Sequence, residues 1–163
     1  MANVLVGYAT RGGATREVAE AIAAGIRQAG HTVEVADLKS TPTIDGIDAA
    51  VIGSGIQAGV WYSESLQWLD QNAAALGDRP VALFNVCLTA QDPAQRDSAL
   101  AYNKVPTAKL TAVADAETFA GRYVPAKASW WQRLLLKGLR QGAQDHVDPA
   151  GATAWGKKLA ALV

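Results

Sequence analysis

Short apolar runs alternate with longer amphipathic stretches along most of the chain. The apolar stretches have the length and composition of buried strands, and they cover residues 4–7, 33–36, 49–53, 81–86 and 112–119. Apolar residues at helical spacing predict helices over residues 15–28, 63–75, 93–104 and 150–162, the last of them starting at Asp148 or Pro149. Apolar strands separated by helices predict an α/β fold with a parallel sheet covered on both faces.

Ligands of such sheets bind beyond the carboxyl ends of the strands, where the strand order reverses. For five strands in the order 2-1-3-4-5, the loops after the first, third and fourth strands border that point. These loops cover residues 10–15, 54–62 and 87–91. We therefore expect a ligand site where the three loops meet.

The first of these loops has the composition of a phosphate-binding turn. Hydroxyls at Thr10 and Thr15 and glycines at Gly12 and Gly13 lie between a buried strand and a helix. The start of a helix offers unpaired N–H groups and the positive end of the helix dipole. The loop lacks the Lys-Ser/Thr ending of a Walker loop and the G-x-G-x-x-G of dinucleotide sites, so it suits a phosphomonoester such as that of FMN. The alternative is a plain glycine-rich turn with a threonine N-cap.

The second loop combines two glycines, Gly55 and Gly59, with the adjacent aromatic residues Trp61 and Tyr62. This composition suits a loop that folds over a flat ring system, and we expect Trp61 or Tyr62 to stack near the ligand. The alternative is that both aromatic side chains fill the gap beneath the following helix. In the third loop, Cys87 is either a small buried hydrophobe or a neighbour of the ligand.

An extra amphipathic segment at about residues 122–142 follows the fifth predicted strand. Pro125 blocks regular structure, and a helical pattern begins after Ser129. Basic residues lie on one side of this helix and apolar residues on the other: Arg133, Lys137 and Arg140 against Trp130, Trp131, Leu134, Leu135 and Leu139. Such a helix suits a membrane interface or a partner, or it packs on the sheet edge.

Composition and charge narrow the class of protein. The 163 residues are half hydrophobic and carry no net charge, which predicts one domain over residues 1–163 and no nucleic-acid partner. The part up to Arg79 has five Lys/Arg and nine Asp/Glu, and the rest has ten and six, so the basic excess comes late. No signal peptide precedes the first strand and no apolar run could span a bilayer, so we expect a cytoplasmic protein, with peripheral contact at the inner face of the membrane as an option. One cysteine and two histidines predict neither a disulfide nor a metal site.

The loop Thr10-Arg11-Gly12-Gly13-Ala14-Thr15 resembles the phosphate loop of flavodoxins, with Gly12 in place of a hydroxyl residue. Its Thr-Arg-x-Gly-x-Thr form is most similar to that of the menaquinone-dependent protoporphyrinogen dehydrogenases. The similarity continues in the second loop at residues 51–56, Gly59, Tyr62 and Ser63, and in the third at residues 85–88, Pro93, Arg96 and Tyr102. Late positions follow the same family in order: Gly121, Arg122, Tyr123, Trp131, Arg133, Gly142 and Trp155.

The resemblance implies a flavodoxin-like three-layer sandwich that binds FMN. The implied FMN contacts are Thr10, Arg11, Gly12, Gly13, Ala14, Thr15, Ser54, Gly55, Ile56, Gln57, Ala58, Gly59, Trp61, Tyr62, Asn85, Val86, Cys87, Leu88, Thr89 and Gly121. The implied reaction is the oxidation of protoporphyrinogen IX, a step of heme biosynthesis, with electrons passed to a quinone. No side chain is expected to be an essential acid or base, because the flavin supplies the chemistry. Contacts with substrate or membrane are expected at Arg122, Trp130, Trp131, Arg133 and Lys137.

Three other functions fit parts of this pattern. A flavodoxin that carries electrons between proteins is the main one, although such carriers usually present an acidic rim and this chain has a basic late half. A nicotinamide-dependent flavin or quinone reductase would need a second nucleotide pocket, for which the sequence offers no candidate. A domain that has lost its cofactor would not need the glycines and Thr15 of the first loop.

Overall fold

A five-stranded parallel sheet forms the centre of the protein. The structure is a computed structural model, and it describes residues 1–123, 130–131, 134 and 144–163. The strands lie in the order β2-β1-β3-β5-β6. Their bounds are Asn3–Ala9 for β1, Thr32–Asp37 for β2, Ala49–Gln57 for β3, Val81–Cys87 for β5 and Asp115–Ala120 for β6. The short strand β4, Val60–Trp61, pairs antiparallel with the end of β3. Counted without β4, this is the predicted order 2-1-3-4-5, which is confirmed.

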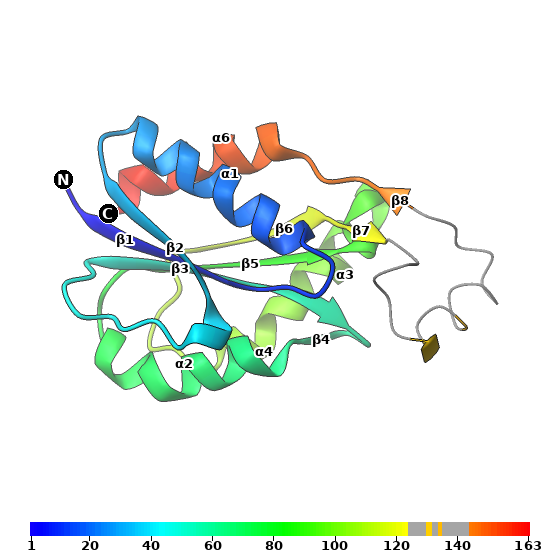
Figure 1. The fold of residues 1–163 in the computed structure, drawn as a ribbon, viewed down its shortest axis with the longest axis horizontal. Coiled ribbons are helices and arrows are strands. Elements are labelled where there is room, and N and C mark those ends of the chain that lie inside the picture. The colour runs from blue at the N-terminus through cyan, green and yellow to red at the C-terminus, as the bar shows by residue number, and fades with distance from the viewer. Residues whose placement is uncertain (124–129, 132–133, 135–143) are drawn as a thin grey trace.

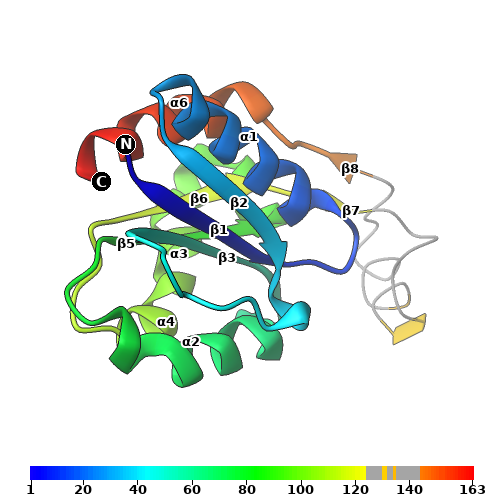
Figure 2. The same ribbon diagram turned by 60° about the vertical axis from the view of Figure 1, so that its left-hand side comes forward.

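Helices cover both faces of the sheet (Figure 1). Helices α1, Ala14–Gln28, and α6, Pro149–Leu159, lie on one face, and α2, Ser63–Leu76, α3, Arg96–Leu100, and α4, Lys104–Thr107, lie on the other (Figure 2). Short 3₁₀ turns cover Leu38–Ser40, Leu88–Gln91, Pro93–Gln95, Ala101–Asn103 and Ala160–Leu162. The result is the three-layer sandwich that the alternating pattern predicts.

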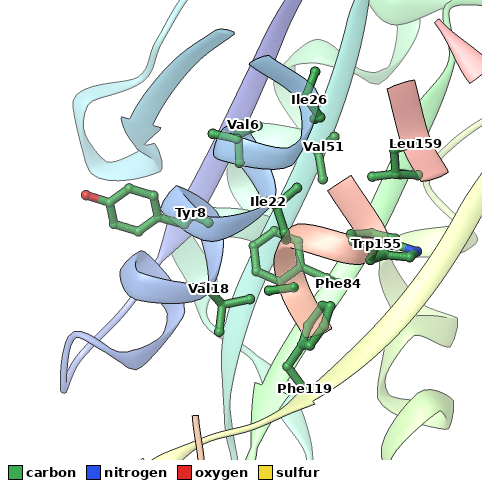
Figure 3. Close-up of a cluster of buried hydrophobic side chains, with 14 of the residues drawn as sticks. Val6, Tyr8, Val18, Ile22, Ile26, Val51, Phe84, Phe119, Trp155 and Leu159 are labelled. Atoms are coloured by element: carbon green, nitrogen blue, oxygen red, sulfur yellow. The ribbon is translucent and has the colours of Figure 1, made fainter. Parts of the chain in front are cut away.

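Neighbouring residues of each strand point to opposite faces of the sheet and belong to two separate hydrophobic cores. In β1, Val4 and Val6 face the core under α1 and α6, while Leu5 faces the core under α2. Because both faces of the sheet are covered, the three central strands β1, β3 and β5 are mostly apolar at consecutive positions, whereas the edge strands β2 and β6 also carry charged residues. Figure 3 shows the first core, where the rings of Phe84, Phe119 and Trp155 meet edge to face at centroid distances of 5.8–6.3 Å.

Three details of the predicted secondary structure differ from the structure. The helix predicted over residues 93–104 is broken into short successive pieces, Pro93–Gln95, Arg96–Leu100, Ala101–Asn103 and Lys104–Thr107, which alternate between 3₁₀ and α geometry. The fifth strand begins at Asp115, three residues after its predicted start at residue 112. The N-cap of α1 is Gly13, so Thr15 lies inside the first turn of the helix and is not its cap.

A second, two-stranded sheet lies beyond the end of β6. It joins β7, Arg122–Tyr123, to β8, Gln144–Asp145, in antiparallel register, and the sequence pattern predicted neither strand. The pairing brings together the two ends of the predicted amphipathic segment. Most of that segment, residues 124–129, 132–133 and 135–143, lies outside the described residues.

Candidate functional site

The three loops singled out in the sequence leave the sheet at neighbouring points of one edge. Ala9, the last residue of β1, pairs in register with Ser54 of β3, and Ser54 pairs with Asn85 of β5. Strands β4, β7 and β8 lie at the same end of the molecule, opposite both chain termini (Figure 1). The parallel sheet therefore brings together loops that are about forty residues apart in the chain, as the carboxyl ends of parallel strands require.

The loop between β1 and α1 is built to present backbone N–H groups. The N–H of Gly13 donates to Thr10 Oγ1 at 2.9 Å, which closes the loop, and Gly13 has a φ of +91°, a conformation that glycine adopts readily. Helix α1 has no side-chain cap, and its first intrahelical bond runs from the N–H of Glu17 to the carbonyl of Gly13. The N–H groups of the preceding helical residues have no carbonyl one turn back. They remain available to an anion at this helix start.

The surroundings of this loop leave room for a phosphate. A Cβ built on Gly12 or Gly13 would meet no atom within 4 Å. Thr15 is only 3% exposed, and its hydroxyl makes no hydrogen bond to any residue that the structure describes. A hydroxyl with no hydrogen-bond partner among the described residues, next to the N–H groups at the start of α1, fits a phosphate oxygen.

Arg11 links the phosphate loop to the start of α2. Its guanidinium forms a two-point ion pair with the Glu64 carboxylate, at 2.7 and 2.9 Å, and its Cζ lies 4.2 Å from the ring centroid of Tyr62. The hydrogen bond from Arg11 lowers the pKa of Glu64 to about 2. Burial raises the pKa of the Tyr62 phenol. Glu64 is therefore ionised and Tyr62 neutral at physiological pH.

The second loop is a tight hairpin between β3 and β4. Ile56 pairs with Trp61 and Gln57 with Val60, while Ala58 and Gly59 turn the chain with φ values of 50° and 78°. Positive φ at both central residues is the geometry that matches the twist of a two-residue hairpin. Ala58 adopts this conformation without being glycine, which is uncommon and is found most often at functional loops.

Ser54 and Gly55 set the position of Tyr62 after the hairpin. Ser54 Oγ accepts the N–H of Tyr62 at 2.9 Å and donates to the carbonyl of Gly55 at 2.7 Å. A Cβ on Gly55 would lie 2.6 Å from the Tyr62 ring, so glycine is needed for the ring to lie there. Tyr62 is half-buried and borders the loop cluster.

Trp61 fills the gap beneath the following helix and does not border the loop cluster. It is 3% exposed, lies in the core beneath α2, and donates its indole N–H to Asn103 Oδ1 at 3.2 Å. Tyr62 is thus the aromatic residue of this pair that borders the cluster of loops.

A buried polar network lies behind the hairpin. Asn103 Oδ1 accepts from both Trp61 and Asn85 Nδ2, the second at 3.0 Å, and the Thr118 hydroxyl donates to Asn85 Oδ1 at 2.8 Å. Asn85 also donates to the carbonyl of Ala99, so its polar atoms are all engaged inside the protein. Sequence analysis did not single out Asn103 and Thr118, because a polar residue in a predicted helix or strand carries no local sign of burial.

The remainder of the third loop lies close to the sheet edge. Val86 is buried, and Cys87 is 8% exposed, with burial raising the pKa of its thiol. The N–H of Gly121 donates to the Cys87 carbonyl, which joins the ends of β5 and β6. Leu88 and Thr89 follow in the turn over Leu88–Gln91; Thr89 is half-buried and so is Leu88.

The residues expected to contact substrate or membrane include one that is already engaged in ion pairs, several that are exposed, and two that lie outside the described residues. Arg122 binds Glu17 at 2.7 Å and Asp145 at 3.0 Å, so its guanidinium already joins α1, β7 and β8. Trp130, Trp131 and Leu134 are 78%, 39% and 66% exposed. Arg133 and Lys137 lie outside the described residues.

The described residues contain neither a membrane-spanning helix nor a cluster of metal ligands. No helix there is long and apolar enough to cross a bilayer. No group of His, Cys, Asp and Glu among them could hold a metal ion.

Comparisons with known proteins agree with this geometry. A family model described as "Flavodoxin domain" matches residues 5–149. The structure is similar to a flavodoxin from the domain Archaea, with a TM-score of 0.65 and 15% identity over 98% of this chain and 97% of that one. It is equally similar to oxidised Flavodoxin 1 from Bacillus cereus, with a TM-score of 0.65 and 16% identity over 99% of each chain.

A curated relative carries a more specific name. Protoporphyrinogen IX dehydrogenase [quinone] of Escherichia coli (strain K12) is 31% identical over 94 residues, which cover 56% of this chain and 52% of the relative. The chain thus spans about half the length of the curated relatives that it matches.

Proposed function

The chain belongs to the flavodoxin domain family, whose cofactor is FMN, and we propose that it oxidises protoporphyrinogen IX and passes the electrons to a quinone. The observation that carries FMN binding is the convergence of the three loops at one sheet edge, with an uncapped helix start among them. The partial similarity to protoporphyrinogen IX dehydrogenase [quinone] supports the choice of substrate and acceptor.

The phosphate of FMN would lie at the start of α1. The backbone N–H groups of residues 14–16 and the hydroxyls of Thr10 and Thr15 would donate to it. The absence of a hydroxyl side chain at Gly12 is offset by the backbone, since the loop is open on that side. The charge of the phosphate is also favoured by the positive end of the α1 dipole.

The ring system of FMN would lie against the other two loops. When bound, FMN supplies a ring that accepts and releases electrons. Tyr62 would cover part of it, and the remaining contacts are proposed at Arg11, Gly13, Ala14, Ser54, Gly55, Ile56, Gln57, Ala58, Gly59, Val86, Cys87, Leu88, Thr89 and Gly121. The role of these residues is to bind and orient the ring and to exclude water. No acid or base among the described residues is assigned a step.

The segment between β7 and β8 would provide the contact with substrate and acceptor. A porphyrinogen has a large apolar face and carboxylates, and menaquinone, the acceptor that the family resemblance implies, resides in membranes. Trp130 and Leu134 are exposed, and the sequence supplies Arg133 and Lys137 close to them. Exposed tryptophans beside basic residues suit both an apolar molecule with carboxylates and an anionic lipid surface.

An anaerobic assay tests the proposed function. FMN-loaded protein is mixed with protoporphyrinogen IX and a soluble quinone, and the formation of porphyrin is followed by its fluorescence. The rate should exceed both autoxidation and the rate of the FMN-free protein, and quinone reduction should accompany porphyrin formation. The variant Thr15→Val should bind FMN about tenfold or more weakly, because a hydrogen bond to a charged group is lost.

The same assay distinguishes the alternative function. A yellow, FMN-loaded protein that gives no porphyrin above autoxidation, but reduces or oxidises a protein partner, would be a flavodoxin-type electron carrier. A colourless protein that cannot be loaded with FMN would contradict flavin binding itself.

A further inference from the structure

Arg11 belongs to the phosphate loop by sequence, but its contacts lie in the neighbouring loop. Both terminal nitrogens of its guanidinium bind the Glu64 carboxylate, at the start of α2. Its contact within the phosphate loop, to the carbonyl of Thr10, is long at 3.5 Å. The charged end of Arg11 is therefore held by residues 53 positions further along the chain.

The guanidinium also covers a face of the Tyr62 ring. The distance of 4.2 Å from Cζ to the ring centroid is that of a cation–π contact. Two further residues fix Tyr62: Gly55 lacks a side chain and so leaves space for the ring, and Ser54 accepts the backbone N–H of Tyr62. Tyr62 is thus fixed by three loop residues from two different loops.

We propose that Arg11 is a positioning residue, which holds the Tyr62 ring for the flavin and so couples the phosphate loop to the ring-binding loop. This inference rests on the proposed binding of FMN. Glu64 orients Arg11 in this arrangement, and Lys39, 3.8 Å from the same carboxylate, offsets its charge further. The planar guanidinium can bind a carboxylate at two points while it stacks on a ring, and the ammonium of lysine cannot.

Riboflavin provides the discriminating probe, because it has the ring of FMN and lacks the phosphate. Dissociation constants for FMN and riboflavin are measured by flavin fluorescence for the wild type and for Arg11→Gln, Arg11→Lys and Arg16→Gln. A residue that positions Tyr62 affects both ligands by the same factor, whereas a phosphate contact affects FMN alone. Arg16→Gln is the matched control, since it removes one positive charge from the first turn of α1.

Arg11→Gln should weaken the binding of both ligands by about three- to tenfold, the size expected for loss of a cation–π contact that orders a ring. Arg11→Lys should show most of this loss, and Arg16→Gln should leave riboflavin binding unchanged. In a protein that already carries Tyr62→Leu, Arg11→Gln should have little further effect on riboflavin. The aromatic NMR resonances of Tyr62 in the FMN-free protein should shift in Arg11→Gln and stay in place in Arg16→Gln.

Loss of FMN affinity with unchanged riboflavin affinity would overturn the inference and make Arg11 a phosphate contact. Unchanged Tyr62 resonances in Arg11→Gln would overturn it as well. A wild-type protein that binds neither flavin would contradict the proposed function. A wild type that binds both flavins, with riboflavin binding unaffected by Arg11→Gln, would contradict only the role of Arg11.

Discussion

The Glu64 carboxylate is strongly stabilised in its ionised form by Arg11. Its two-point contact with Arg11 stabilises the carboxylate and lowers its pKa to about 2. A carboxyl group with a lower pKa in the folded than in the unfolded protein stabilises the fold above its unfolded pKa. This stabilisation is lost as the pH falls from about 4.5 towards 2.

The variant Glu64→Gln should therefore differ from the wild type in a pH-dependent way. At pH 6 the wild type should be more stable by about 0.5–1 kcal/mol, a modest value because Arg11 is 41% exposed to solvent. At pH 2.5 the difference should be much smaller. Chemical unfolding of the FMN-free protein at both pH values measures this. Glu20→Gln, at an exposed position of α1, is the control, and a constant difference for Glu64→Gln would contradict the prediction.

The β3–β4 hairpin depends on elements that are distant in sequence. Its last residue, Trp61, donates to Asn103, which follows α3, and Asn103 in turn binds β5 through Asn85 and β6 through the Glu117 carbonyl. These groups are buried, so each needs its partner inside the protein. The network keeps the turn at Ala58 and Gly59 at the sheet edge, where the ring of FMN is proposed to bind.

Replacement of Asn103 by leucine should destabilise the protein by about 2–4 kcal/mol, because it leaves the Trp61 indole N–H buried without its partner and removes one of the two acceptors of the Asn85 amide group. Amide hydrogen exchange of residues 56–61 should accelerate more than that of β1. Asn72→Leu is the matched control: Asn72 is half-buried and bonds only within α2, so its loss should cost less than about 1 kcal/mol. Equal effects of the two substitutions would contradict a special role for the network.

The chain termini and the loop cluster lie at opposite ends of the molecule. Both termini lie at the amino end of the sheet, and the loop cluster, β7 and β8 lie at the other (Figure 1). Arg122 joins α1 to the β7–β8 pair through Glu17 and Asp145, so the ends of segment 124–143 are attached beside the phosphate loop. The exposed side chains of Trp130, Trp131 and Leu134 belong to this segment.

Joint replacement of Trp130, Trp131 and Leu134 by serine should weaken binding to vesicles rich in anionic lipid by more than about tenfold, because these exposed apolar side chains make the proposed contact with the bilayer. FMN binding should be unchanged. Vesicle co-sedimentation at low and high salt measures the effect. Val105→Ser, at an exposed apolar position of α4, is the control, and unchanged vesicle binding in the triple variant would assign these side chains to packing on the protein.

Much of the fold was predictable because its signals are local. The alternation of apolar strands with amphipathic helices indicated a parallel sheet covered on both faces, and the strand order, which located the three loops at one edge, came from the resemblance to flavodoxins. Residues 93–104 are helical as predicted, but in short 3₁₀ and α pieces, and the burial of Asn103 among partners in β4, β5 and β6 carries no local signal. Strands β7 and β8 are too short to carry a pattern of their own.

The sequence by itself determined the α/β class and the candidate phosphate loop, since hydroxyls and glycines between a strand and a helix act through backbone geometry within a few residues. Only the tertiary structure decided which side chains meet. It placed Trp61 in the core, engaged Arg122 with Glu17 across 105 positions, and set Arg11 over Tyr62. Such contacts depend on how helices pack across the sheet, and no local pattern of residues encodes the partner of a long polar side chain.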